Sequence, residues 1–158
     1  MPVRKMRELL DREHVRYVTI QHSPAYTAQA VGASAHLPAD EVAKTVMIEV
    51  DGRMAMAVLP ASFQVEFDAL KKALGTRDVR LLHENDFKDR FPDCEPGAMP
   101  PFGNLYGMPV FMSETLARQE YIAFSAGTHR EVVIIPYADY ERLVGPRVLN
   151  FASEVLAL

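Results

Sequence analysis

The hydrophobic and polar positions of the chain follow patterns that change along its length. Residues 3–13 place apolar side chains three or four positions apart with charges between them, the spacing of a helix that packs one face on a core. Residues 43–50 and 53–60 are two apolar, strand-favouring runs, and Asp51-Gly52 between them is a preferred pair for a tight hairpin turn. We therefore expect an amphipathic helix first and a β-hairpin near the middle of the chain.

Shorter patterns predict the remaining elements. We expect helices at 27–36, 66–74, 84–91 and 136–144, and strands at 16–20, 78–82, 109–113, 121–127 and 130–137. Gly75 is expected to end the helix before it, and Pro136 to begin the last helix, where its missing N–H costs little. Because the strands do not alternate regularly with helices, the sequence favours an α+β fold with a mixed sheet over a doubly wound parallel sheet.

A loop rich in proline and glycine spans residues 92–109, with five prolines and three glycines in eighteen residues. This density is incompatible with a regular helix or a central strand, so we expect a long, stiff connection. Its apolar residues, among them Met99, Phe102 and Tyr106, argue against disorder. Since long ordered loops in compact domains are usually functional, this segment is the first place to look for a site.

Composition and charge limit the classes of function. With 158 residues, nearly half of them apolar, the chain is expected to form one domain, residues 1–158, with a substantial core. The formal net charge of −4 argues against binding nucleic acid through a broad basic surface, so such contact would be local. Cys94 is the single cysteine and no Cys/His cluster has zinc-site spacing, so we expect no disulfide, metal or cofactor. No apolar run is long enough to span a membrane and the start does not read as a signal peptide, which predicts a cytoplasmic protein.

Four segments together carry a resemblance to a known family. They are HSPAYTAQ at 22–29, EVAKTV at 41–46, EPGAMPPFG at 95–103 and FSAGTH at 124–129. In this order and spacing they resemble the YbaK/EbsC and prolyl-tRNA-synthetase-associated superfamily of aminoacyl-tRNA editing domains, over nearly the whole chain. The resemblance implies a mixed, partly closed β-sheet or barrel flanked by helices, with the acceptor end of tRNA entering a groove between them.

The resemblance also implies an activity. Members of the superfamily hydrolyse the ester that joins a wrong amino acid to a tRNA, as free-standing proteins or as inserted domains. The expected function is a free-standing aminoacyl-tRNA deacylase that edits in trans, with mischarged tRNA bound at its acceptor end or delivered by an aminoacyl-tRNA synthetase. Alanyl, cysteinyl, seryl and threonyl groups all remain open as substrates, and the oligomeric state is open too.

Three residues are expected to form the catalytic part of the site. By resemblance Lys44 lies at the groove, where its ammonium can hold a terminal phosphate or ribose, or orient the ester; without the resemblance, a lysine stem reaching solvent from a strand edge explains it better. Gly97 lets the backbone approach a ligand closely, and the prolines after it preset N–H groups that suit an ester carbonyl becoming an oxyanion. His129, in a turn between strands, can act as a general base or hydrogen-bond the substrate.

Further residues in the same segments, and Met47 directly after the second of them, are expected to contact the substrate. They are His22, Tyr26, Thr45, Met47, Ala98, Met99, Pro100, Pro101, Phe102, Gly103, Ser125, Gly127 and Thr128. The large apolar members of this set are individually better explained as core residues.

The mechanism expected from the sequence needs no covalent intermediate. Neither a serine–histidine–acid set with known motif spacing nor a phosphate-binding glycine loop is present. Because the aminoacyl ester is already activated, preset donors that hold its carbonyl while water attacks are expected to suffice. The resemblance implies that the tRNA's own hydroxyl or the substrate's own side chain assists. A thiol enzyme built on Cys94 is disfavoured, because a free cysteine near a site is common and the family does not use one. The competing class is a non-catalytic module that binds tRNA ends or aminoacyl groups, or regulates a protein partner.

Overall fold

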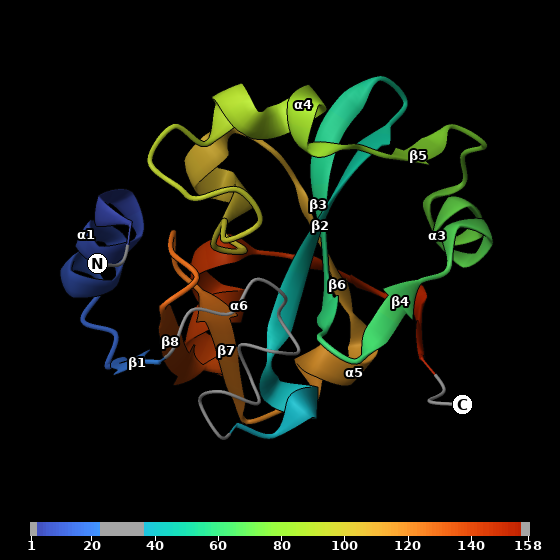
Figure 1. Ribbon diagram of the computed structural model, residues 1–158. Helices are drawn as coiled ribbons and strands as arrows, with labels where there is room; N and C mark the ends of the chain where they lie inside the picture. Colours follow the sequence, from blue (N-terminus) through green and yellow to red (C-terminus); the bar gives the residue numbers. More distant parts are fainter. Residues whose placement is uncertain (1–2, 23–36, 156–158) are drawn as a thin grey trace.

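The computed structural model describes residues 3–22 and 37–155 of the chain. Figure 1 shows a twisted central sheet with a smaller sheet beside it and helices around both. The helices are α1 (Arg4–Arg12), α3 (Phe67–Leu74), α4 (Glu84–Phe87), α5 (Glu114–Ala117) and α6 (Tyr137–Val144), with 3-10 turns η1 (Ala39–Glu41), η2 (Lys88–Arg90) and η3 (Gly103–Tyr106). The strands are β1 (Val18–Gln21), β2 (Ala43–Val50), β3 (Arg53–Pro60), β4 (Phe63–Val65), β5 (Val79–Leu81), β6 (Val110–Ser113), β7 (Tyr121–Ser125), β8 (Glu131–Pro136), β9 (Arg147–Leu149) and β10 (Ala152–Glu154). None of the described helices is long and apolar enough to cross a membrane.

The described strands form three sheets. Five make a mixed sheet in the order β5-β2-β3-β6-β9, in which β2 pairs antiparallel with β5 and β3, while β6 pairs parallel with β3 and β9. Three make an antiparallel sheet in the order β1-β8-β7, and β4 pairs with β10. A parallel bridge between Val42 and Ala123 joins the two larger sheets at one corner, but the described strands do not close into a barrel. The predicted mixed α+β fold is confirmed.

The central hairpin has the predicted strands and turn. β2 and β3 pair along their whole length, from Ala43 at one end to Val50 at the other. Asp51 and Gly52 have φ of 49° and 82°, and positive values at both positions are what a two-residue type I′ turn requires. The hydroxyl of Thr76 donates to the Asp51 carboxylate at 2.5 Å, which ties the turn to the segment before β5.

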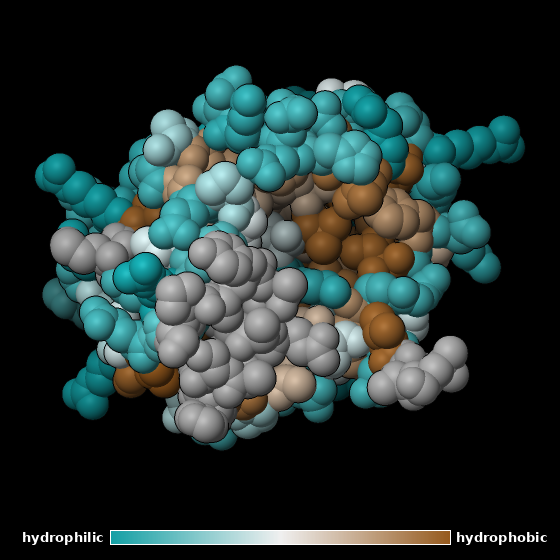
Figure 2. Space-filling model, viewed as in Figure 1, coloured by the Kyte–Doolittle hydropathy of each residue, from teal (hydrophilic) through white to brown (hydrophobic). Residues whose placement is uncertain are grey.

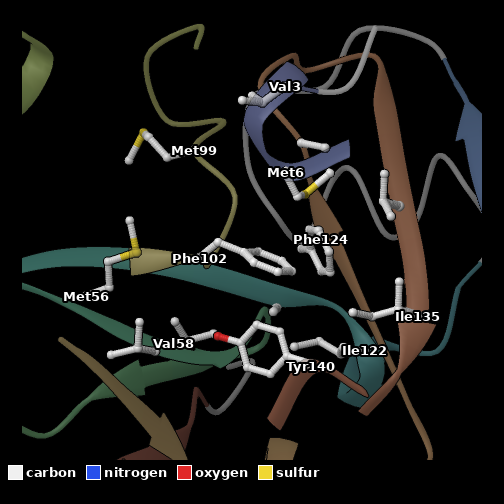
Figure 3. Packing of buried hydrophobic residues seen from close by; sticks show 14 of the residues in the cluster. Val3, Met6, Met56, Val58, Met99, Phe102, Ile122, Phe124, Ile135 and Tyr140 are labelled. Atoms are coloured by element: carbon white, nitrogen blue, oxygen red, sulfur yellow. The ribbon is translucent and has the colours of Figure 1, made fainter. Parts of the chain in front are cut away.

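Side chains along β2 and β3 point alternately to the two faces of the central sheet, so the core is divided into two main clusters, one on each face. The first cluster, which contains Met56, Phe102 and Tyr140, lies between the two larger sheets and receives α1 and α6 (Figure 3). The second cluster contains Ile48 and Leu70 and packs α3 on the opposite face. Each large apolar side chain buried in this way stabilises the fold by roughly 1.5–3 kcal/mol. The hairpin is therefore held from both sides, and its two ends are fixed relative to the other elements.

Most predicted elements are present, with shifts at their ends. α3 ends at Gly75, whose φ of 69° is the left-handed cap typical of a C-terminal glycine. The helix predicted at 84–91 breaks at Phe87, where a φ of −130° separates α4 from η2. The first strand begins later than predicted, at Val18, and Pro136 ends β8 and caps α6 instead of lying inside that helix. The helix predicted at 27–36 lies outside the described residues.

Four short elements were not predicted from the sequence, namely β4, α5, β9 and β10. Each has only three or four residues, which is too short for a period to be recognised. β4 and β10 pair across a long stretch of sequence, with Val65 opposite Ala152. Their extended conformation is therefore a consequence of tertiary pairing more than of local pattern.

Candidate active site

The proline-rich loop is fastened to the turn that follows β7. The N–H of Glu95 donates to the carbonyl of Gly127 at 2.8 Å, and the N–H of Gly127 donates to the carbonyl of Ala98 at 2.7 Å. These two bonds form a short ladder between segments that are far apart in the sequence. Because a buried backbone group gives up a hydrogen bond only at a cost, the ladder holds residues 95–98 in one position relative to β7.

His129 adds a side-chain link at the same place. Its Nε2 lies 2.6 Å from the carbonyl oxygen of Pro96, and because a carbonyl only accepts, Nε2 carries the proton. Its backbone N–H donates to the carboxylate of Glu95 at 3.3 Å, and the residue is only 6% exposed. A Cβ built on Gly97 would lie 3.5 Å from Cε1 of the His129 ring. The structure therefore brings together two of the three predicted catalytic residues.

The fastened loop presents backbone donors. Gly97 has a φ of 81°, a left-handed conformation that glycine adopts without strain. The N–H of Ala98 donates to the carbonyl of Glu95 at 3.0 Å, whereas no described residue accepts a hydrogen bond from the N–H of Gly97 or of Met99. These two N–H groups therefore have capacity for a further hydrogen bond; that they bind a ligand oxygen stays a prediction.

The later part of the loop packs into the first cluster. The Phe102 ring lies 5.4 Å from the ring centroids of both Phe124 and Tyr140, and Figure 3 shows it next to both. The hydroxyl of Tyr140 donates to the carbonyl of Pro101 at 2.5 Å. Since the Phe102 side chain is fully buried, it supports the loop from inside, and any contact of this residue with a substrate would be made by its backbone.

Exposure divides the predicted contact residues into two groups. Residues 98–103 are all buried, whereas 95–97 are exposed and the side chains of Ser125 and Thr128 are partly exposed. Thr128 accepts at its hydroxyl oxygen from the N–H of Arg130 at 3.3 Å. Side chains able to meet a substrate therefore lie at the start of the loop and in the turn that holds it.

Lys44 lies near the start of β2, and its side chain points away from the first cluster. Ala43 and Met47 belong to that cluster, and because side chains alternate along a strand, Lys44 projects from the other face while Thr45 shares theirs. Partial burial lowers the pKa of Lys44 below its ordinary value. No described residue forms an ion pair or hydrogen bond with the ammonium. A partly desolvated cation without a partner is a candidate for binding an anionic or strongly polar group.

An isolated parallel bridge joins β7 to the residue two positions before Lys44. Val42 and Ala123 form the parallel bridge and share a small third cluster. Side chains two positions apart along a strand lie on the same face. Lys44 therefore lies on the same face as Val42, and Ser125 on the same face as Ala123. β7 then leads directly to Gly127, where the loop is fastened. The chain thus connects the bridge next to Lys44 with the turn that fastens the loop; that Lys44 and the loop border one groove stays a prediction.

An apolar surface adjoins Lys44. Figure 2 shows an apolar area, bordered by hydrophilic surface, over the region where β2, β3 and β4 lie in Figure 1. Lys44 pairs with Leu59 of the second cluster, so it shares this face of the hairpin. The partly buried members of the second cluster are Val46, Val50, Phe63, Val65, Phe67, Leu74, Leu149 and Ala152. A cation next to an apolar surface suits a ligand that has a charged part and a flat apolar part.

Cys94 does not have the properties of a nucleophile. It lines a small hollow between the start of the loop, at Pro96 and Met99, and the side chains of Phe87 and Phe91. Burial raises the pKa of Cys94 to about 11, so the thiol is protonated at neutral pH. A thiolate, not a thiol, is the reactive form, and this argues against the thiol enzyme that the sequence had already disfavoured.

Two further predicted contacts lie at the edge of the described structure. His22 follows β1, and its backbone N–H donates to the carbonyl of Arg130 at 2.8 Å, which places it near the turn that contains His129. Tyr26 lies outside the described residues.

Comparison with known proteins decides the family. Residues 22–143, which are most of the chain, match the aminoacyl-tRNA editing domain family. The chain belongs to this family. The resemblance recognised in four sequence segments is thereby confirmed, and the matched region contains Lys44, Gly97 and His129.

Relatives of the editing domain include named enzymes. The chain is 27% identical to the multifunctional Ser/Thr-tRNA deacylase ProXp-y of Escherichia coli strain K12. The identity is over 148 residues, which cover 90% of this chain and 88% of that protein. A candidate trans-editing enzyme for prolyl tRNA synthetase superposes with a TM-score of 0.78 at 15% identity, covering 96% of both chains. The crystal structure of a hypothetical protein superposes with a TM-score of 0.83 at 15% identity, covering 94% of this chain and 99% of the other. The structural likenesses confirm the fold.

Sequence reasoning missed two residues that hold the loop of this editing domain. Glu95 belongs to a matching segment, but its carboxylate had no assigned role until it was seen to accept the N–H of His129. Tyr140 has the helical spacing of an ordinary core aromatic, and no local signal shows that its hydroxyl reaches Pro101. Both roles depend on contacts between residues more than thirty positions apart, which a single sequence does not reveal.

Proposed function

We propose that this editing domain is a free-standing aminoacyl-tRNA deacylase that hydrolyses the ester of a mischarged tRNA. Its family and its likeness to a Ser/Thr-tRNA deacylase over most of both chains support the proposal. The observation that carries it is the partly buried ammonium of Lys44, which no described residue neutralises. Lys44 lies two positions after the residue that bridges to β7, and β7 leads to the turn that fastens the loop, which is consistent with the two taking part in one site.

Lys44 is assigned to binding the end of the tRNA. Its ammonium would hold the terminal phosphate or ribose, and the apolar surface beside it offers a place for the adenine ring. An ammonium that is already partly desolvated interacts more strongly with a phosphate than a fully hydrated one does. Binding would therefore recover the free energy that burying the charge costs.

The backbone of the loop is assigned to the chemical step. Water adds to the carbonyl carbon of the ester, the bond from that carbon to the ribose oxygen breaks, and the proton released by the water ends on the ribose hydroxyl. During the addition, the N–H groups of Gly97 and Met99 donate to the negative charge that develops on the carbonyl oxygen. A single preset donor of this kind is worth about 100- to 1,000-fold in rate.

His129 is assigned to holding the loop. Its Nε2–H is engaged with the Pro96 carbonyl, so of the two ring nitrogens only Nδ1 could serve as a base. Its ring also lies against Gly97. These contacts favour a role in positioning the loop over the role of general base that the sequence had left open.

The proposed substrates and partners follow from the relatives and from the charge. The relative's name points to seryl and threonyl groups as the first to test, with alanyl and cysteinyl groups beside them. A net charge of −4 limits the proposed tRNA contact to the acceptor end, or requires a synthetase that delivers the tRNA. We also propose that residues 1–158 act as one domain and that the protein works in the cytoplasm, where tRNA is charged.

A deacylation panel tests the proposal. Seryl-, threonyl-, alanyl- and cysteinyl-tRNA are incubated with the wild type, with Lys44→Ala and with the matched control Lys72→Ala. Lys72 is an exposed lysine on α3, which Figure 1 shows on the other side of the central strands from β7. We expect turnover by the wild type and by Lys72→Ala, and its loss in Lys44→Ala. Tight binding of tRNA without hydrolysis of any ester would instead support the non-catalytic binding module.

A further inference from the structure

On its buried side, the loop is hydrogen-bonded to a tyrosine of α6. Tyr140 is fully buried, and its hydroxyl donates to the carbonyl of Pro101 at 2.5 Å. Burial raises the pKa of Tyr140 well above its ordinary value, so the hydroxyl keeps its proton throughout the neutral range. Tyr140 is therefore a permanent donor to the loop.

The Tyr140 ring that carries this hydroxyl is packed among other aromatic rings. Phe102 meets Tyr140 edge-on, with centroids 5.4 Å apart and an interplanar angle of 88°, and it meets Phe124 at 5.4 Å on its other side. Figure 3 shows the three rings packed together. Phe124 lies on β7, which continues into the turn at 127–129. The loop is thus held at its start by the turn and at its end by the tyrosine.

We propose that Tyr140 is a positioning residue for deacylation, which sets the place of the loop whose N–H groups meet the ester. The inference rests on the proposed function. Pro100 and Pro101 have fixed φ, so the short segment between Met99 and the anchored carbonyl moves nearly as one piece. A shift of the anchor therefore moves the N–H of Met99, and a displacement of about 1 Å at a reacting centre can cost roughly 100-fold in rate.

The same helix supplies a matched control. Tyr137 precedes Tyr140 on α6 and is buried in the same first cluster, but its hydroxyl has no hydrogen-bond partner among the described residues. Tyr137→Phe and Tyr140→Phe remove the same atom from the same helix. Only the second change breaks a link to the loop.

The test compares the two variants with the wild type by two measurements. The first is steady-state deacylation of the best ester of the panel, well below the unfolding temperature. For Tyr140→Phe we expect kcat to fall about 10- to 100-fold with KM within about twofold, because the loop is misplaced while tRNA binding through Lys44 persists. The second is amide hydrogen exchange, which should accelerate at Ala98 and Phe102 and stay unchanged in the β2–β3 hairpin. Tyr137→Phe should leave both measurements within about twofold of the wild type.

Several results would overturn the inference. A kcat of Tyr140→Phe within twofold of the wild type, or an equal fall in both variants, would show that the hydroxyl does not position the loop. If the wild type hydrolyses no ester, the proposed function fails, and exchange at Ala98 and Phe102 still decides whether Tyr140 holds the loop. If Tyr140→Phe does not fold, the wild-type hydroxyl proton is observed by NMR: slow exchange with solvent supports the bond to Pro101, and fast exchange contradicts it.

Discussion

Replacing Lys44 by methionine should separate the stability of the editing domain from its activity. Methionine keeps an unbranched side chain of similar reach and removes the charge. In the wild type the ammonium is partly buried and no described residue neutralises it, so its removal relieves a desolvation cost. The same change removes the group assigned to the end of the tRNA. We expect a variant that is more stable and less active.

The gain in stability follows from the position of the side chain. Fully burying a methionine is worth roughly 1.5–3 kcal/mol, and the lysine stem already buries part of that area, so the free energy of unfolding should rise by about 0.5–1 kcal/mol. A change of about 1 kcal/mol shifts Tm by roughly 2–4 °C in a protein of this size. An expected Tm increase of about 1–4 °C is measurable by circular dichroism.

The pH dependence of this gain has a defined sign. The pKa of Lys44 is lowered in the folded state, so the charge destabilises the fold fully at pH values below the folded pKa. The penalty disappears as the pH rises past the ordinary value of 10.5, because both states then lose the proton. The Tm difference between Lys44→Met and the wild type should therefore shrink as the pH approaches and passes that value.

The loss of activity is measured on the ester panel. A hydrogen bond to a charged group contributes about 1.5–3 kcal/mol, so kcat/KM should fall by roughly 10- to 150-fold. Lys72→Met serves as the control and should change neither Tm nor kcat/KM appreciably. A Lys44→Met variant that keeps wild-type kcat/KM would refute the role in binding, and one that loses several degrees of Tm would show that the charge has a stabilising partner.

Three other changes give distinct outcomes. His129→Gln keeps a donor that can reach the Pro96 carbonyl and should retain more activity than His129→Ala in the same deacylation assay; equal losses would argue for an imidazole base. Cys94→Ala should keep near-normal activity, because the pKa of about 11 leaves little thiolate at neutral pH, and inactivation would revive the thiol mechanism. Gly103→Ala would place Cβ 2.6 Å from the carbonyl oxygen of Met108, so denaturant unfolding should show a loss of about 1–3 kcal/mol; an unchanged midpoint would contradict this packing.

The elements that could be predicted are those specified by local pattern. The hairpin turn at Asp51-Gly52 needs positive φ at both positions, and that residue pair provides it, so strands and turn were predicted together. Gly75 ends α3 for a similar local reason. β9 and β10 have three residues each and owe their conformation to partners far away in the chain, so no local pattern indicates them.

The sequence predicted which segments form the candidate site, but not the contacts between them. The loop at 95–103 and the turn at 127–129 were recognised separately, and the structure shows that backbone hydrogen bonds join them. The spacing of residues in a sequence does not show which carbonyl a buried hydroxyl reaches, so the link from Tyr140 was missed. Proline and glycine content indicates a turn without indicating which of its residues face the core, so the division between the exposed residues 95–97 and the buried residues 98–103 was not predicted.

The central claim is that the loop binds the ester carbonyl while Lys44 binds the adjoining end of the same tRNA. It is tested most directly by the structure of a complex with a non-hydrolysable aminoacyl-adenosine amide, which mimics the charged tRNA end. The carbonyl oxygen of the amide should lie about 2.7–3.1 Å from the N–H of Gly97 or Met99, with the Lys44 ammonium at the ribose or phosphate. An analogue bound elsewhere, or with its carbonyl facing away from the loop, would contradict the claim.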